Sequence, residues 1–233
     1  KRSSLKAALQ QTQQAEACTP TGAEEMADPS TMYRWRKMTP SQREAALKQR
    51  RESHRPLHSP PHYDNFETSY FMITAACFEH RPVIGNTPER MTDFESSLLA
   101  VLHASCRTVF AWTVLPNHYH VLVDIESVKG LLAEIGKLHG RSSFDWNGED
   151  NQRGRQVWCN AAETEMKSEG HYYATLNYVL NNAVHHGYVH RWSEWPYCNA
   201  AQYLDTFGRE KALAIWRAYP LFDYGKDWDP PER

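Results

Sequence analysis

The chain has 233 residues, of which 41% are hydrophobic and 12% aromatic, and its formal net charge is -2 at pH 7. This composition fits one packed domain with extensions, and the charge balance excludes a uniformly basic nucleic-acid binder but not a local basic face. The five cysteines form no CxxC pair, which argues against a disulfide framework and a structural zinc site, and no apolar run reaches the length of a membrane span. We therefore expect a protein of the reducing cytoplasm with no signal peptide and no membrane partner.

Residues 1–62 are predicted to be an extension of the folded domain. Residues 1–31 show no sustained periodicity, which is typical of a segment without fixed structure. From Arg34 to Arg55 there are eight Lys or Arg residues and two Glu, which leaves six positive charges, and Thr39-Pro40 predicts a short helix over residues 41–52. A run of charges is more often a solvated face, but cations interleaved with aromatic residues suit phosphates and stacked bases. The candidate DNA contacts are Arg34, Trp35, Arg36, Lys37, Arg50 and Arg51.

The folded domain is predicted over residues 63–190. Strands are expected over residues 70–78, 109–115, 118–125 and 156–161, and helices over residues 88–102, 128–138 and 171–186. Residues 140–154 are polar and contain glycine, so we expect a mobile loop there. The order β-α-β-β-α-β-α predicts an α+β fold, a ferredoxin-like sandwich with an antiparallel sheet and helices packed on one face. Residues 191–233 are expected to form a C-terminal tail with a helix.

A pair of histidines lies in the third predicted strand. His118 and His120 are two residues apart, and because side chains alternate along a strand they project from one face while Tyr119 points to the other. Two neutral imidazoles side by side can hold one divalent ion. With 12 histidines in the chain an accidental pair is easy to obtain. The flanking segments are apolar on both faces, however, and an imidazole in such surroundings needs a hydrogen bond or a metal.

The helix predicted over residues 171–186 carries a second candidate group. Tyr178 and Asn182 are four positions apart, so they are neighbours on a polar stripe opposite an apolar one. A single tyrosine on a polar face is usually an ordinary surface residue. A nucleophile must be accessible, and a phenol beside an amide ligand is placed for covalent catalysis if this stripe reaches the two histidines.

Two motifs together resemble a known family. The sequence Leu115-Pro116-Asn117-His118-Tyr119-His120-Val121-Leu122-Val123, followed by Tyr178-x-x-x-Asn182-x-Val184-x-x-Gly187, resembles the single-tyrosine HUH transposases, especially the REP-associated tyrosine transposases. The resemblance runs from about residue 70 to residue 189, and Gly140-Arg141, Trp158, Trp192-Ser193 and the basic entry at residues 33–37 are also similar. Two positions depart from the family pattern. The middle of the histidine triplet is Tyr119 where the family usually has an aliphatic residue, and Asn182 is followed by Ala183 where proline is common.

The resemblance implies cleavage and rejoining of single-stranded DNA at hairpin sites. It implies Tyr178 as the nucleophile, which would form a 5′-phosphotyrosine and release a 3′-hydroxyl without ATP, and His118, His120 and Asn182 as ligands of Mg²⁺ or Mn²⁺. Nitrogen ligands make Mn²⁺ as suitable as Mg²⁺, and zinc also accepts these ligand types. Arg141 joins the basic segment as a DNA contact.

Two other functions stay open from the sequence alone. A DNA-binding protein could keep this fold without transposition and regulate repetitive hairpins, and a replication or mobilisation nickase would use the same chemistry on another substrate. The presence of Tyr178, His118 and His120 favours an enzyme over a binding module. We expect a bacterial, nucleoid-associated protein, monomeric or homodimeric, whose partner is a single-stranded DNA hairpin.

Overall fold

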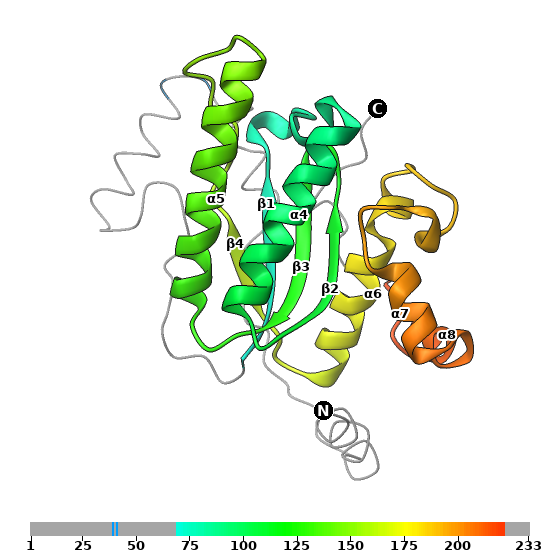
Figure 1. The fold of residues 1–233 in the computed structure, drawn as a ribbon. Coiled ribbons are helices and arrows are strands. Elements are labelled where there is room, and N and C mark those ends of the chain that lie inside the picture. Colours follow the sequence, from blue (N-terminus) through cyan, green and yellow to red (C-terminus); the bar gives the residue numbers. More distant parts are fainter. Residues whose placement is uncertain (1–38, 40, 42–68, 222–233) are drawn as a thin grey trace. The chain divides into compact units, whose positions relative to one another are not determined.

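A computed structural model of the chain describes residues 39, 41 and 69–221, all within the unit Met38–Arg233. Four strands form one antiparallel sheet in the order β2-β3-β1-β4 (Figure 1). The predicted α+β class and ferredoxin-like strand order are confirmed. The strands are β1 (Tyr70–Ala76), β2 (Thr108–Val114), β3 (His118–Asp124) and β4 (Ala162–Glu165). The helices are α4 (Pro88–Ser105), α5 (Val128–Glu149), α6 (Glu169–His185), α7 (Ala200–Phe207) and α8 (Arg209–Ala218), with 3-10 turns η2 (Phe78–His80), η3 (Ile84–Asn86) and η4 (Trp192–Glu194).

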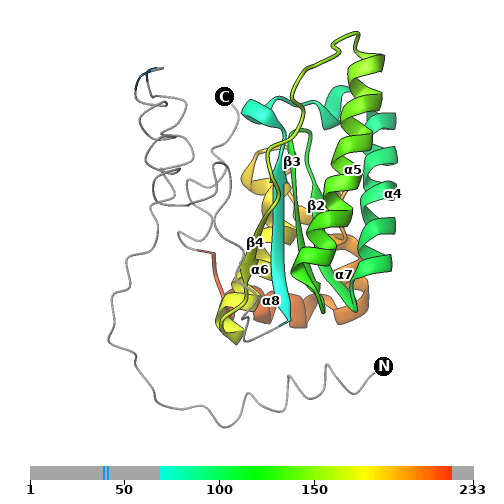
Figure 2. The same ribbon diagram turned by 90° about the vertical axis from the view of Figure 1, so that its left-hand side faces the viewer.

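Helices cover both faces of the sheet, as Figure 2 shows. The helices α4 and α5 pack on one face, where their apolar residues form a core with Tyr119 and Val121 of β3. The helix α6 packs on the opposite face, over Met72 of β1 and Leu122 of β3. The expectation that the helices pack on one face therefore holds for α4 and α5 and is wrong for α6, the helix predicted over residues 171–186. Both faces of β3 are buried, so the second face needs a cover as well.

The helix α5 is longer than the sequence predicts. It continues to Glu149, so the expectation of a loop over residues 140–154 is wrong for its first ten positions. The ring of Trp146 packs against Phe94 of α4 with centroids 5.6 Å apart, and the indole N–H of Trp158 donates to Ser142 Oγ at 3.0 Å. These buried contacts outweigh the roughly 1 kcal/mol that each glycine costs in a helix.

The fourth strand lies later in the chain than predicted. The expected strand over residues 156–161 is wrong, because the strand that pairs with β1 is Ala162–Glu165. The apolar character of the earlier segment reflects packing in the core: the Trp158 ring stacks on His139 at 4.1 Å and on Phe94 at 5.2 Å. The strand β4 is short and polar, as an edge strand often is.

The other edge of the sheet is covered by the segment before α7. Asn199 uses both ends of its amide, because Oδ1 accepts from Trp112 N at 2.9 Å and Nδ2 donates to Phe110 O at 3.0 Å. The indole N–H of Trp195 donates to Val114 O at 2.9 Å. These bonds satisfy the free side of β2, and two helices follow where the sequence predicts one. Within residues 69–221, none of the helices is both long and apolar enough to cross a membrane.

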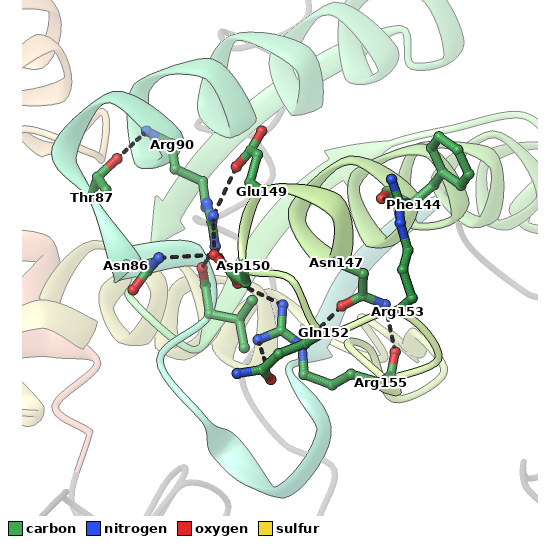
Figure 3. Close-up of polar contacts among 11 residues, drawn as sticks. Asn86, Thr87, Arg90, Phe144, Asn147, Glu149, Asp150, Gln152, Arg153 and Arg155 are labelled. Atoms are coloured by element: carbon green, nitrogen blue, oxygen red, sulfur yellow. Dashed lines mark hydrogen bonds and ion pairs between the residues drawn. The ribbon is translucent and has the colours of Figure 1, made fainter.

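A charge network ties the first turn of α4 to the end of α5 (Figure 3). Arg90, whose side chain is 6% exposed, donates to Asp150 at 2.7 Å and to Glu149 at 2.8 Å. Arg155 donates to the other carboxylate oxygen of Asp150 at 2.7 Å. Hydrogen bonds from Arg90 first, and then from Arg155, lower the pKa of Asp150 to about 2. The carboxylate therefore stays charged well below pH 3.8, the ordinary value for an aspartate.

Candidate active site

The two histidines lie on β3, which β1 and β2 flank on either side. His120 is opposite Thr74 and His118 is opposite Ala76 in the register of β1. Both imidazoles are fully buried, and their ring centroids are 5.0 Å apart. They face α6, whereas Tyr119 enters the core under α4 and α5. The predicted shared face of the pair is confirmed.

Asn117 orients the first imidazole. The amide nitrogen Nδ2 of Asn117 donates to His80 O at 3.2 Å. This bond directs the amide oxygen Oδ1 toward His118, and Oδ1 lies 2.6 Å from His118 Nδ1. An amide oxygen only accepts, so Nδ1 of His118 carries the proton and Nε2 keeps its lone pair. This pattern, a histidine that donates one N–H to a partner and turns its other nitrogen inward, is typical of metal ligands.

Thr74 is the hydrogen-bond partner of the second imidazole, that of His120. Its hydroxyl oxygen lies 2.8 Å from Nδ1 of His120. In the tautomer in which that Nδ1–H donates to Thr74, the lone pair is on Nε2, which points at α6. Thr74 comes from the neighbouring strand, so the pairing of β1 with β3 supplies this partner.

The helix α6 brings Tyr178 and Asn182 to the two histidines. The phenol oxygen of Tyr178 lies 3.5 Å from His120 Nε2, and Oδ1 of Asn182 lies 3.1 Å from His118 Nε2. Ser168 caps this helix by accepting from His171 N, and four positions separate the two residues, which places both on the face toward β3. The structure thus gathers all four residues that the sequence singles out as nucleophile and metal ligands.

The polar stripe of α6 is buried. Tyr178 is 1% exposed and Asn182 is fully buried, as are most residues of the opposite apolar stripe. The sequence predicts that this stripe is the accessible side of the helix, and that expectation is wrong for Tyr178 and Asn182. The helix packs between the sheet and the residues of α7 and α8, so the part of the polar stripe that holds Tyr178 and Asn182 is covered, whereas His185 at its end is exposed.

The other tyrosines of this region lie elsewhere. The ring of Tyr172 packs against Tyr70 and Phe110, and burial raises the pKa of its phenol. Tyr173 stacks on Tyr219 with centroids 4.9 Å apart. Tyr178 is the tyrosine of α6 that contacts the pair, and its ring centroid lies 5.1 Å from that of His120.

The donor atoms of the site fit a divalent metal ion. In the assigned tautomer, His118 Nε2 and Asn182 Oδ1 are two acceptors that face each other, and a cation beside them makes this contact favourable, as does rotation of the amide so that Nδ2 donates to Nε2. In addition, the buried Nδ2 of Asn182 has no hydrogen-bond partner in the described part of the chain. Residues 69–221 contain no group of three or more His, Cys, Asp or Glu side chains that could hold a metal. The third protein donor available here is therefore an amide oxygen.

Several residues near the site were not predicted from the sequence. Asn117 adjoins the histidine pair and could have been noticed there, whereas Thr74 is 46 positions before His120 and is found only through the strand pairing. The ring of His186 lies 4.8 Å from that of His118. Gly85 presses on the turn that precedes the pair: its N–H donates to Pro116 O at 2.9 Å, and a Cβ at this position would overlap the Pro116 side chain.

Of the predicted DNA contacts, Arg141 is the one that lies within the described residues. Arg141 is exposed on α5, on the face of the sheet opposite the histidine pair. The basic candidates, Arg34, Trp35, Arg36, Lys37, Arg50 and Arg51, lie outside the described residues.

Comparison with known proteins gives structural neighbours only. No protein-family model and no curated protein matches the chain. One similar solved structure is a REP-associated tyrosine transposase bound to a REP hairpin, with a TM-score of 0.47 and 16% identity over 74% of this chain and 97% of that one. Another, described as a "putative transposase from Deinococcus radiodurans R1", has a TM-score of 0.33 and 12% identity over 52% of this chain and 95% of that one.

Proposed function

We propose that the protein is a transposase-like HUH endonuclease that cleaves and rejoins single-stranded DNA at hairpin sites, with Tyr178 as nucleophile. The observation that carries the proposal is the meeting of four side chains: the Tyr178 phenol is 3.5 Å from His120 Nε2, and Asn182 Oδ1 is 3.1 Å from His118 Nε2. A nucleophile beside a buried set of nitrogen and oxygen donors is an arrangement suited to phosphoryl transfer. We assign this activity to residues 63–190.

The proposed reaction exchanges one phosphate ester for another. The phenol oxygen of Tyr178 attacks the phosphorus, the new Tyr–O–P bond forms, and the bond from phosphorus to the 3′-oxygen breaks. The proton lost from the phenol is balanced by the proton gained by the leaving 3′-hydroxyl. The reverse attack by a 3′-hydroxyl restores the DNA strand and the free tyrosine. The number of ester bonds is unchanged, so the reaction needs no ATP.

His118, His120 and Asn182 would hold Mg²⁺ or Mn²⁺. When bound, such an ion polarises the scissile phosphate and stabilises the charge that builds up on its oxygens. The protein orients the donors in advance. Asn117 Oδ1 accepts from His118 Nδ1 at 2.6 Å, which turns the Nε2 lone pair toward α6, and the Thr74 hydroxyl, 2.8 Å from His120 Nδ1, does the same for His120 in the tautomer in which Nδ1 donates. Burial of the pair excludes water from the donor atoms. Arg141 and the basic segment at residues 34–51 would contact DNA phosphates and bases.

The test is the formation of a covalent adduct. The protein would be incubated with Mn²⁺ and a panel of labelled single-stranded hairpins, and denaturing gels would reveal DNA attached to protein. Tyr178→Phe is the matched control, because it removes one oxygen and keeps the ring. We expect adduct from the wild type and none from the variant. Adduct from the variant would assign the nucleophile to Tyr172, Tyr173 or Tyr188.

The same panel separates the two alternatives. Hairpin binding without adduct under every metal would indicate a regulator that lacks the strand-transfer activity. Adduct on single strands regardless of a neighbouring hairpin, without rejoining to a second strand, would indicate a replication or mobilisation nickase. The proposed function requires both the adduct and its transfer to a new 3′-hydroxyl.

A further inference from the structure

A cavity of about 530 Å³ opens between α6, η4, α7 and α8. These helices lie side by side in Figure 1. Its volume falls in the range of small-ligand sites, roughly 300–1,000 Å³. Among its described lining residues Arg209 carries the only charge. The residues used below are Asn181, Trp192, Leu204, Arg209, Leu213 and Trp216.

The walls of the cavity are aromatic and apolar. The rings of Trp192 and Trp216 have centroids 6.2 Å apart at an angle of 43°, so they diverge and are not stacked on each other. Both side chains are half-buried, and Leu213 is 43% exposed beside them. Divergent indoles at an open cavity offer flat apolar surface to a planar group.

The single charge of the cavity fits an anion. Arg209 is exposed at the first position of α8, and no carboxylate in the described part of the chain pairs with it. Asn181 supplies the polar group on the α6 side. A planar apolar surface, one free guanidinium and one amide together suit a nucleotide: a base against the indole, a phosphate on the arginine and a hydrogen bond to the base edge.

The cavity borders the helix that carries the nucleophile. Asn181 follows Tyr178 by three positions, which is about 4.5 Å along a helix axis, and directly precedes Asn182. A DNA strand whose phosphate reaches Tyr178 therefore carries its neighbouring nucleotides past this part of α6.

We propose that the cavity binds an unpaired nucleobase of the single-stranded DNA beside the cleaved phosphodiester, with the base against Trp216 and the adjoining phosphate on Arg209. This inference rests on the proposed function and extends it, because it gives α7 and α8 a part in holding the substrate. Base stacking tolerates any sequence, since every base has a flat face. The cavity thus holds the strand, and Asn181 is the group in it that can discriminate between bases.

The test compares two labelled hairpins with the same number of phosphates. One carries a single-stranded oligothymidine extension, and the other an extension of equal length made of abasic units. Affinities are measured by fluorescence anisotropy in the Tyr178→Phe background, which keeps the substrate intact. We expect Trp216→Ala to weaken binding of the thymidine extension roughly tenfold or more and to leave the abasic one unchanged. Trp216→Phe should restore most of the affinity.

Arg209→Gln should weaken both extensions by the same factor and reduce the salt slope of log affinity by about 0.7, because both carry the phosphate. Arg217→Gln is the matched control on the same helix: its side chain is exposed and does not line the cavity, so both affinities should stay unchanged. If Trp216→Ala lowers the melting temperature, Leu213→Gln replaces it, because that side chain is already 43% exposed.

Two results would overturn the inference. Equal losses on the two extensions for Trp216→Ala would mean that the indole supports the fold, and a wild type that does not distinguish them would mean that no base is held. The adduct assay gives an independent readout. If adduct forms but Trp216→Ala has no effect on binding, the cavity does not contact the substrate and the proposed enzyme activity stands. If Trp216→Ala weakens binding in a base-dependent way but no adduct forms, the cavity binds DNA and the proposed enzyme activity is contradicted.

Discussion

Oδ1 of Asn117 lies 2.6 Å from Nδ1 of His118, and this contact decides which nitrogen of the histidine is free to bind a metal. The amide is itself held by its bond to His80 O, so the orientation of the imidazole is set before any ion arrives. Partners of this kind typically contribute a factor of 10 to 100 to metal affinity.

Asn117→Ala should therefore weaken Mn²⁺ binding roughly 10- to 100-fold. Isothermal titration calorimetry measures this without DNA. Asn147→Ala is the control, because it removes an amide hydrogen bond from α5 to Arg155 O, on the other face of the sheet from the histidine pair, and its Mn²⁺ affinity should match the wild type. An unchanged affinity in Asn117→Ala would show that His118 is oriented by other contacts.

His118→Ala and His120→Ala should each abolish DNA cleavage and leave hairpin binding largely intact. Phosphate and stacking contacts carry affinity independently of the ion. Gel-shift titration measures binding, and the adduct assay measures cleavage. Undiminished cleavage by the wild type in EDTA would contradict the metal role.

Arg90→Gln should destabilise the fold by roughly 3 kcal/mol, because it leaves carboxylates and the Val83 carbonyl without their buried partner. Urea unfolding gives the free energy. The control is Arg107→Gln, whose side chain is 44% exposed in its pair with Asp124, so water and salt screen it and the loss should be much smaller. Similar losses in both variants would mean that the Arg90 network adds nothing through its burial.

The same network predicts that the free energy of unfolding decreases at acid pH. The pKa of Asp150 is lowered from 3.8 to about 2, so the folded protein keeps this carboxylate ionised where the unfolded chain protonates it. The stabilisation is complete above pH 3.8 and is lost as the pH falls toward 2. Asp150→Asn should flatten the unfolding free energy across this window, and an unaltered slope would contradict the assignment.

His139 predicts a second pH dependence in a higher window. Burial lowers its pKa from 6.5 to about 4, so the folded protein keeps the imidazole neutral where the unfolded chain takes up a proton. Its contribution is complete above pH 6.5 and falls by up to about 3 kcal/mol as the pH drops toward 4. His139→Phe keeps a ring against Trp158 and should show a flatter dependence in urea unfolding between these values. If the wild type and His139→Phe show the same slope of unfolding free energy against pH, other groups determine the pH dependence.

The basic segment makes a prediction that depends on sequence alone. Neutralising Arg34, Arg36, Lys37, Arg50 and Arg51 should lower the salt slope of log affinity by about 0.7 for each lost phosphate contact. Hairpin affinity across a salt series measures the slope. Saturating DNA should restore the cleavage rate if these residues only hold the substrate. Unchanged affinity and an unchanged salt slope would mean that these residues are exposed to solvent and do not contact DNA.

Local pattern was enough to predict much of the fold. The histidine pair, the hairpin at Pro116-Asn117 and the helix of Tyr178 follow from alternation and helical spacing, which the structure keeps. The errors arose where tertiary contacts outweigh local pattern. The polar, glycine-containing sequence after residue 139 suggested a loop, but Trp146 and Ser142 reach buried partners and extend the helix.

Only part of the site could be predicted from the sequence. Spacing identified the residues that carry chemistry, because nucleophiles and ligands belong to a few residue types. The residues that orient them are ordinary in type: Thr74 is one more threonine until its strand is paired with β3. The burial of Tyr178 also depends on helices that lie after it in the chain, which no window around the tyrosine contains.

A substitution at Gly85 would disturb the site. This glycine lies outside both motifs and bears no chemistry, yet the turn that delivers Asn117 and His118 rests directly against it. Any larger residue there must displace Pro116, and the displaced turn carries the imidazole with it. A larger side chain at position 85 is therefore expected to disturb the site as much as the loss of a ligand would, although it removes no functional group.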